Sequence, residues 1–101
     1  MISPGEGSPK DAKKVSFPFG RLVTTPNAMQ SVPLEVMIGA LARHGRGDWG
    51  IVGAEDWDAN QKALENGERL VSAYFTKESG KFFVITEADR SQTTILMPED
   101  Y

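Results

Sequence analysis

The residues that could do chemistry gather around one turn near the C-terminus. They place hydroxyls, carboxylates and a guanidinium at one end of two apolar segments: Thr86, Glu87, Asp89, Arg90, Ser91, Thr93 and Thr94. One interpretation is a polar site carried on a rigid hairpin. The other is an ordinary solvated turn, in which Asp89 and Arg90 form a surface pair worth less than about 1 kcal/mol.

Two residues outside this turn complete a set suited to acid–base chemistry. The single histidine, His44, closes a helical pattern, and Tyr74 lies within a strand pattern. RNA cleavage by attack of the 2′-hydroxyl needs a base, an acid and a cation at the phosphate. His44, Tyr74 and Arg90 could take these roles beside Thr93. In the competing interpretation His44 is a core residue or caps the helix, whose C-terminus favours an imidazolium.

A second group of residues is suited to protein binding. Asp48 and Trp49 lie in a glycine-rich loop, and Asp56 and Asp58 lie early in the helix that follows. An aromatic anchor rimmed by charge is typical of protein interfaces. The alternatives are that Trp49 packs in the core beneath the loop, and that the acids are solvated and favoured by the helix dipole.

The polar turn is expected to join two strands, over 81–86 and 93–97, that are rich in β-branched and aromatic residues. A tip at 89–90 gives three cross-strand pairs: Thr86 with Thr93, Val84 with Ile95, and Phe82 with Met97. Because both faces of the pair are largely apolar, this hairpin should be central in its sheet. Pro98 should end the pairing, since proline cannot donate to the ladder.

Helical periodicity marks two further segments. The helix predicted over 33–44 has an apolar line expected to face the core: Leu34, Met37, Ile38 and Leu41. The helix predicted over 54–66 has its own expected buried line: Trp57, Gln61 and Leu64. Short patterns add a strand over 21–24, a brief helix over 26–31 and a strand over 69–76.

Together these elements predict an α+β fold. It comprises an antiparallel β-meander of three to four strands with two to three N-terminal helices packed on one face. Residues 1–16 are rich in Gly, Pro, Ser and Lys and are expected to form a disordered N-terminal tail. Residues 17–101 are expected to form a single α+β domain.

Composition excludes several classes of function. The 101 residues include no cysteine and one histidine, which argues against disulfides and a structural zinc site. We therefore expect no metal, and we expect no cofactor, because the glycines do not match a phosphate-binding loop. A net charge of −3 is unfavourable for phosphate-dominated DNA binding. No apolar run approaches the roughly 20 residues of a membrane helix, so a cytoplasmic protein is expected.

From Phe19 onward the chain resembles a family of small bacterial proteins described as uncharacterised or plasmid-related. The stretches that carry the resemblance are LARH at 41–44, GDWG at 47–50, LVSAY at 70–74, VITEADRS at 84–91, Thr93-Thr94 and PEDY at 98–101. The resemblance implies a setting of plasmids and other mobile elements, and no established activity. The arrangement of helices before an antiparallel sheet is also similar to that of the barnase, EndoU, colicin and RelE ribonuclease group. That similarity is one of layout.

Two functions follow as expectations. The first is an interaction protein of a mobile element, an accessory or defence-modulating factor of inhibitor type that binds another protein. The alternative is a metal-independent ribonuclease toxin that uses His44, Tyr74 and Arg90, with RNA as its partner. A small-molecule sensor is a third hypothesis, for which no cradle motif is present. Homo-oligomers could form through an exposed edge strand at 21–24 or 69–76.

Overall fold

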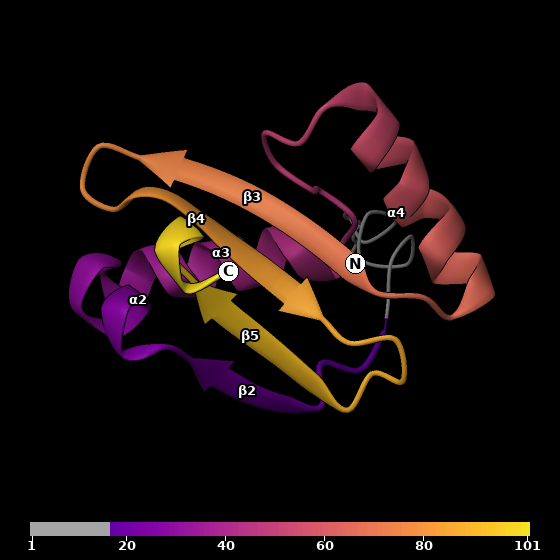
Figure 1. Cartoon of the computed structure of the whole chain (residues 1–101), viewed down its shortest axis with the longest axis horizontal. Coiled ribbons are helices and arrows are strands. Elements are labelled where there is room, and N and C mark those ends of the chain that lie inside the picture. Colours follow the sequence, from indigo (N-terminus) through magenta and orange to yellow (C-terminus); the bar gives the residue numbers. More distant parts are fainter. Residues whose placement is uncertain (1–16) are drawn as a thin grey trace, which may run out of the picture.

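The computed structural model describes residues 17–101, so the predicted tail over 1–16 lies outside the described part. The elements in chain order are β2 (Arg21–Thr24), α2 (Pro26–Ser31), α3 (Leu34–Gly45), α4 (Ala54–Asn66), β3 (Leu70–Thr76), β4 (Gly80–Thr86), β5 (Gln92–Leu96) and a short 3-10 helix, η1 (Pro98–Asp100). This arrangement confirms the predicted α+β class (Figure 1). Within residues 17–101, no helix combines the length and apolar character needed to cross a bilayer.

The four strands form one sheet in the order β2-β5-β4-β3. Strands β3, β4 and β5 form the predicted antiparallel meander, whereas β2 lies parallel beside β5. The hairpin of β4 and β5 is central, and its register pairs Thr86 with Thr93 and Val84 with Ile95 as predicted. The ladder ends at Leu96, short of the predicted Phe82–Met97 pair, because the Met97 N–H donates instead to Asp100 at 3.1 Å.

Helices α2 and α3 cover one face of the sheet, while η1 crosses the other face (Figure 1). The main core lies between these helices and the sheet. Its buried members are Ala28, Val32, Met37, Ala40, Tyr74, Phe82, Val84, Ile95 and Met97. Local signals explain where α2 begins: Pro26 opens the helix, and Thr25 Oγ1 accepts a hydrogen bond from the Ala28 N–H.

The buried face of α3 differs from the predicted one. Met37 is buried together with Ala40 and His44, but Leu34 and Ile38 stay 69% and 58% exposed. Helix α3 rests on the sheet through the small side chain of Ala40. Within residues 17–101 no strand lies beyond β2 to cover the flank that carries Leu34 and Ile38. Half of the predicted apolar line is therefore uncovered.

The predicted buried line of α4 is confirmed only for Leu64, which packs against the buried cluster of Trp49, Ala63 and Leu70. The helix buries Asn60 and Ala63, while Trp57 is 37% exposed and Gln61 is exposed. Helix α4 packs beside the edge of β3 rather than on a sheet face. At this edge the side chains of α4 meet backbone N–H and carbonyl groups of the strand. Apolar periodicity therefore does not predict which of these side chains are buried.

The outer edge of β3 is closed by hydrogen bonds at Val71 and Ala73. The Asn60 amide donates to the Val71 carbonyl at 2.8 Å and accepts from the Val71 N–H at 3.0 Å. The next outward-facing backbone groups, those of Ala73, bond to the loop before α4. The Ala73 N–H donates to the Trp49 carbonyl, and the Ile51 N–H donates to the Ala73 carbonyl. Together they protect the strand from pairing with another chain.

Within residues 17–101, the outer edge of β2 is open. The Arg21 N–H donates to the carbonyl of Ser91, just before β5 begins, and the Thr25 N–H donates to the carbonyl of Ile95 in β5. Because alternate residues of a strand point their backbone groups the same way, Leu22 and Thr24 direct theirs away from the sheet. No strand in the described part of the chain pairs with this edge.

We predict that Asn60→Ala lowers the free energy of unfolding by about 2 kcal/mol, because it leaves the Val71 N–H and carbonyl unpaired at a covered edge. Urea unfolding followed by circular dichroism measures this. Lys62→Ala, on the exposed face of the same helix, is the control and should change stability by under about 1 kcal/mol. Equal effects of the two substitutions would contradict the edge-closing role of Asn60.

Candidate functional site

The predicted base, His44, lies at the centre of a buried chain of hydrogen bonds. Its imidazole is 0% exposed. Nδ1 lies 2.5 Å from Ser72 Oγ, and Nε2 lies 2.9 Å from Thr86 Oγ1. Thr86 in turn lies 2.8 Å from Thr93, which donates to the Phe19 carbonyl at 2.8 Å. The chain therefore links α3 to three strands and to the segment that precedes β2.

The end of this chain fixes where its protons lie. The Thr93 hydroxyl donates its one hydrogen to the Phe19 carbonyl, so the Thr86 hydroxyl must donate to Thr93. His44 Nε2 must then carry the hydrogen that Thr86 accepts. Burial lowers the pKa of His44 to about 4, so the imidazole is neutral near pH 7 and Nδ1 accepts from Ser72.

Aromatic rings surround the imidazole. The ring of Phe17 lies 5.4 Å from it edge-on, Phe19 lies at 6.0 Å and Trp49 at 5.5 Å, measured between centroids. Burial, with a smaller contribution from the Arg90 charge, lowers the pKa of His44 to about 4. A neutral imidazole without solvent access, already using both nitrogens, is poorly placed to take a proton from a substrate.

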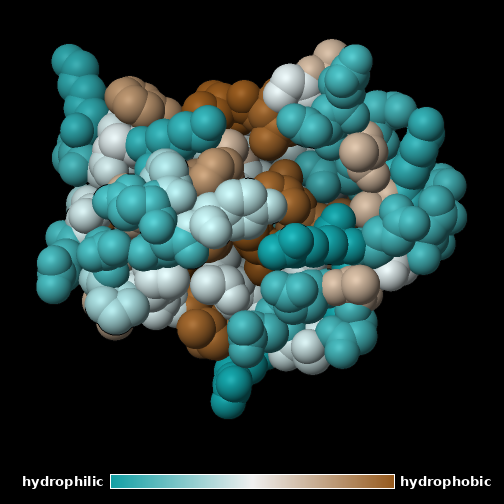
Figure 2. Space-filling model, viewed as in Figure 1, coloured by the Kyte–Doolittle hydropathy of each residue, from teal (hydrophilic) through white to brown (hydrophobic). Residues whose placement is uncertain are grey.

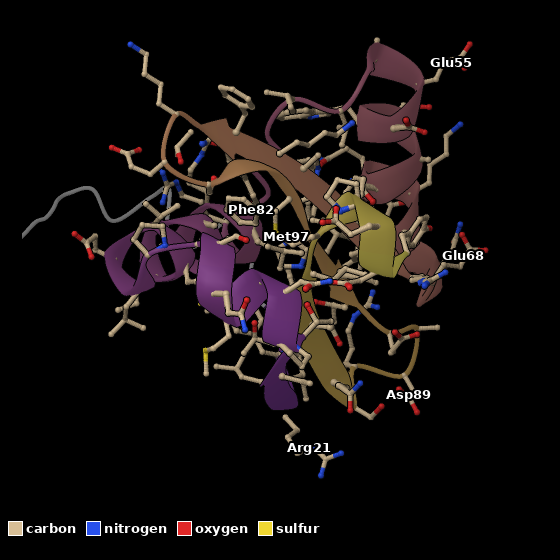
Figure 3. The ribbon with its side chains drawn as sticks, turned by 60° about the vertical axis from the view of Figure 1, so that its left-hand side comes forward. Arg21, Glu55, Glu68, Phe82, Asp89 and Met97 are labelled. Atoms are coloured by element: carbon tan, nitrogen blue, oxygen red, sulfur yellow. The ribbon has the colours of Figure 1, made fainter. Side chains whose placement is uncertain are left out.

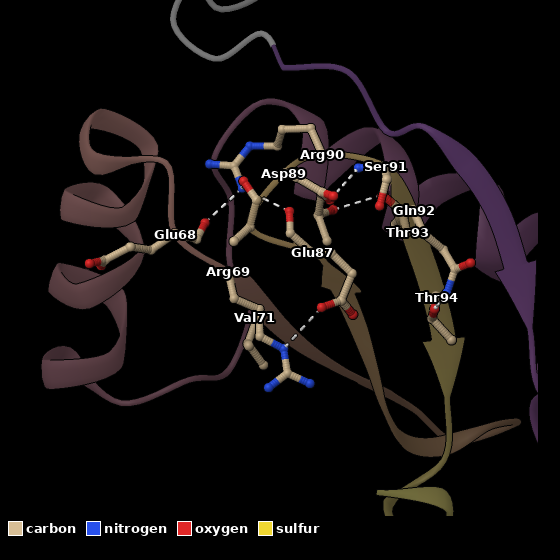
Figure 4. Close-up of polar contacts among 12 residues, drawn as sticks. Glu68, Arg69, Val71, Glu87, Asp89, Arg90, Ser91, Gln92, Thr93 and Thr94 are labelled. Atoms are coloured by element: carbon tan, nitrogen blue, oxygen red, sulfur yellow. Dashed lines mark hydrogen bonds and ion pairs between the residues drawn. The ribbon is translucent and has the colours of Figure 1, made fainter.

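Arg90 is engaged with backbone carbonyls. Its guanidinium donates to Glu68 at 2.7 Å, Glu87 at 3.0 Å, and Ala63 and Ala88 at 3.2 Å (Figure 4). Ala63 lies in the last turn of α4, where a cation is favoured by the helix dipole. Arg90 thus clamps the hairpin turn to the end of α4, at the expense of a left-handed backbone with φ of 61°.

Arg90 and His44 approach each other with a phenylalanine between them. The Arg90 guanidinium lies 5.8 Å from the centroid of the Phe17 ring, and that ring contacts His44. The charge is close enough to disfavour protonation of the imidazole. The two groups do not share an open cleft in which one phosphate could meet both.

Tyr74 is likewise a core residue. It is 2% exposed, and its hydroxyl donates to the Asp48 carbonyl at 2.7 Å. Burial raises the pKa of the Tyr74 phenol to about 12. The Arg43 guanidinium covers its ring at 4.8 Å, so the phenol holds the 43–48 turn against the sheet.

The remaining residues of the polar turn satisfy local partners. Asp89 accepts from the Ser91 N–H at 3.0 Å, and hydrogen bonding from Ser91 lowers the pKa of that carboxyl. Glu87 lies 3.9 Å from Arg69, a long and exposed contact (Figure 4). Thr94 accepts from Gln92 at 3.4 Å. The polar side chains of the turn thus bond to neighbouring residues of the turn and of β3, rather than forming a group of free side chains.

The predicted protein-binding residues are dispersed. Trp49 is 0% exposed and donates to Gln61 at 2.8 Å, so it packs in the core beneath the loop. Asp48 pairs with Arg43 at 2.8 Å, and this hydrogen bond lowers the pKa of Asp48. Asp58 pairs with Lys62 on the exposed face of α4, while Asp56 borders a pocket. The predicted aromatic anchor, Trp49, is therefore not available beside these acids, whereas Trp57, between Asp56 and Asp58, is 37% exposed.

The pocket beside Asp56 opens on the sheet face turned away from α3 and has a volume of about 460 Å³. Figure 2 shows this face, with apolar atoms exposed amid polar ones. Arg69 and Lys81 border it, and they already lie over the rings of Tyr101 and Phe83 at 6.0 and 5.3 Å. Both signs of charge meet at its rim, so the pocket does not select one class of ligand.

An apolar groove lies on the opposite flank, between β2, α2 and α3. It encloses about 310 Å³, and its lining contains no charged residue. Four large apolar side chains around it are more than half exposed: Leu22, Met29, Leu34 and Ile38. Exposed apolar side chains gathered in one place are typical of a binding surface. The sequence pattern signalled two of them, Leu34 and Ile38, but assigned them to the core.

Among residues 17–101 no group of three His, Asp or Glu side chains could hold a metal ion. The chain has no significant match to any family model, curated protein or solved structure. The resemblance to plasmid-related proteins and the ribonuclease-like layout therefore remain predictions.

We predict that stability falls in mild acid because of His44. Its folded-state pKa of about 4 lies below the ordinary histidine pKa of 6.5. The stability that the neutral His44 ring contributes to the fold is therefore complete above pH 6.5, and it is lost as the pH falls toward 4. Between pH 7 and pH 5 the free energy of unfolding should decrease by about 2 kcal/mol. Urea titrations across this range measure it, and His44→Gln should flatten the profile. An unchanged slope in the variant would contradict the assignment.

A second prediction concerns Arg90. Removing its carbonyl contacts in Arg90→Ala should lower the free energy of unfolding by about 2 to 3 kcal/mol. Arg69→Ala is the matched control, because its contact with Glu87 is exposed and should be worth under about 1 kcal/mol. If Arg90→Ala left stability unchanged, the guanidinium would be free for another role.

Proposed function

We propose that this chain is a non-enzymatic, cytoplasmic interaction protein that binds another protein chain through its apolar groove. In keeping with the resemblance to plasmid-related proteins, we place it with mobile elements, as an accessory or defence-modulating factor of inhibitor type. The observation that carries the proposal is the ring of Leu22, Met29, Leu34 and Ile38 around an uncharged groove. Burying these side chains against a partner would remove apolar surface from water.

The alternative, a metal-independent ribonuclease, receives less support from the geometry. It needs an accessible base and a cation free to contact a phosphate. His44 is buried and uses both ring nitrogens, and Arg90 is held by four backbone carbonyls. The hydroxyls that motivated this hypothesis, Thr86 and Thr93, serve the buried hydrogen-bond chain.

We predict that Ile38→Glu lowers affinity for a partner protein at least tenfold, because a carboxylate in an apolar contact must be desolvated. Tagged wild-type protein and variants are compared for the proteins they retain from bacterial cells, and retained partners are then titrated. Ala42→Glu is the control, since Ala42 is exposed on α3 but does not line the groove.

The double substitution of Asp56 and Asp58 by alanine tests the acidic face separately. The proposal predicts that binding survives this change and is lost in Ile38→Glu. Binding that is insensitive to Ile38→Glu would place the contact elsewhere. Cleavage of RNA by the purified wild-type protein, lost in His44→Ala, would restore the ribonuclease hypothesis in its place.

A further inference from the structure

We infer that the occupant of the groove is a second copy of this chain, docked by antiparallel pairing of β2 with β2 across a two-fold axis. This inference rests on the proposed function, because it names the partner of the same surface. It is carried by three independent features: an open strand edge, an apolar flank beside that edge, and a charge distribution that keeps the acidic helix away from it.

The open edge supplies self-complementary hydrogen bonds. Leu22 and Thr24 direct their backbone N–H and carbonyl groups away from β5, while the opposite edge of the sheet is closed at Val71 and Ala73 by Asn60 and the 49–51 loop. An antiparallel pair centred on Val23 would place Leu22 opposite Thr24 of the second copy. Each of these pairs exchanges two hydrogen bonds, so the sheet would continue through the axis.

The helical layer would continue in the same way. Leu22 pairs with Thr93 in the sheet, so its side chain lies on the face covered by α3. The exposed residues of α3, Leu34 and Ile38, lie on the flank that borders β2. Extending the sheet at β2 places the strand of the second copy beside Leu22, and the two grooves then form one apolar surface over the joined strands. The exposed Leu22 side chains, which either copy alone leaves in water, are covered by this pairing.

Charge favours this arrangement over other self-contacts. The chain has a net charge of −3, so two copies repel unless their acidic regions are kept apart. The exposed acids of α4 are concentrated on one side: Glu55, Asp56, Asp58 and Glu65. In Figure 3, Arg21 at the β2 edge and Glu55 on α4 lie at opposite ends of the molecule. A contact through β2 therefore places the acidic helices at the far ends of the dimer.

The test is the molar mass in solution, measured by sedimentation and by light scattering over a range of concentrations. The wild-type chain should show twice its 11.1 kDa mass. Ile38→Glu should be monomeric with an unchanged circular dichroism spectrum. Thr24→Pro should also be monomeric, since it removes an N–H that points away from the sheet, where proline is tolerated. Ala42→Glu should remain dimeric.

Amide hydrogen exchange gives a second readout that does not depend on mass. The Leu22 and Thr24 amides should exchange slowly in the wild-type dimer and at least tenfold faster in Ile38→Glu. A wild-type protein that is monomeric at every concentration overturns the inference, as does a dimer that both Ile38→Glu and Thr24→Pro leave intact. If the monomer nevertheless loses a different bound protein on Ile38→Glu, the proposed function stands and only the second copy is excluded.

Discussion

The structure depends on one buried chain of hydrogen bonds that runs from Ser72 through His44, Thr86 and Thr93 to the Phe19 carbonyl. It joins α3, three adjacent strands and the entry to β2. Each member must find its partner, because an unpaired polar group in the core is costly. A slip of one residue in any of these strands would turn a hydroxyl to the opposite sheet face. The chain thus ties the register of the sheet to the position of α3.

This constraint reverses the first impression given by the polar residues. The hydroxyls and the guanidinium that suggest a catalytic site in the sequence make structural hydrogen bonds instead. The hydroxyls bond in the buried chain around His44, and the Arg90 guanidinium donates to backbone carbonyls. Apolar residues that suggest a core, Leu34 and Ile38, are left in solvent. Function is accordingly sought on the surface that these apolar side chains create, beside the strand edge that has no partner within residues 17–101.

Local signals predicted the elements well, because they act over a few residues. Thr25 and Pro26 mark the start of α2, Gly67 follows α4 with φ of 69°, and the length of the polar turn sets the register of β4 and β5. Local signals could not predict the rotation of α3 and α4 about their axes, which decides which face of each helix is buried. Periodicity identifies an apolar stripe, but only tertiary packing decides whether Ile38 or His44 faces the sheet.

The most direct test of the account is the nitrogen chemical shift of the His44 ring, followed by NMR from pH 8 to pH 5. We expect a neutral ring with hydrogen on Nε2, an unprotonated Nδ1, slow solvent exchange, and little titration until the pH approaches 4. An imidazole that titrates near pH 6.5 with rapid exchange would contradict it. That result would return His44 to the list of groups able to act on a substrate.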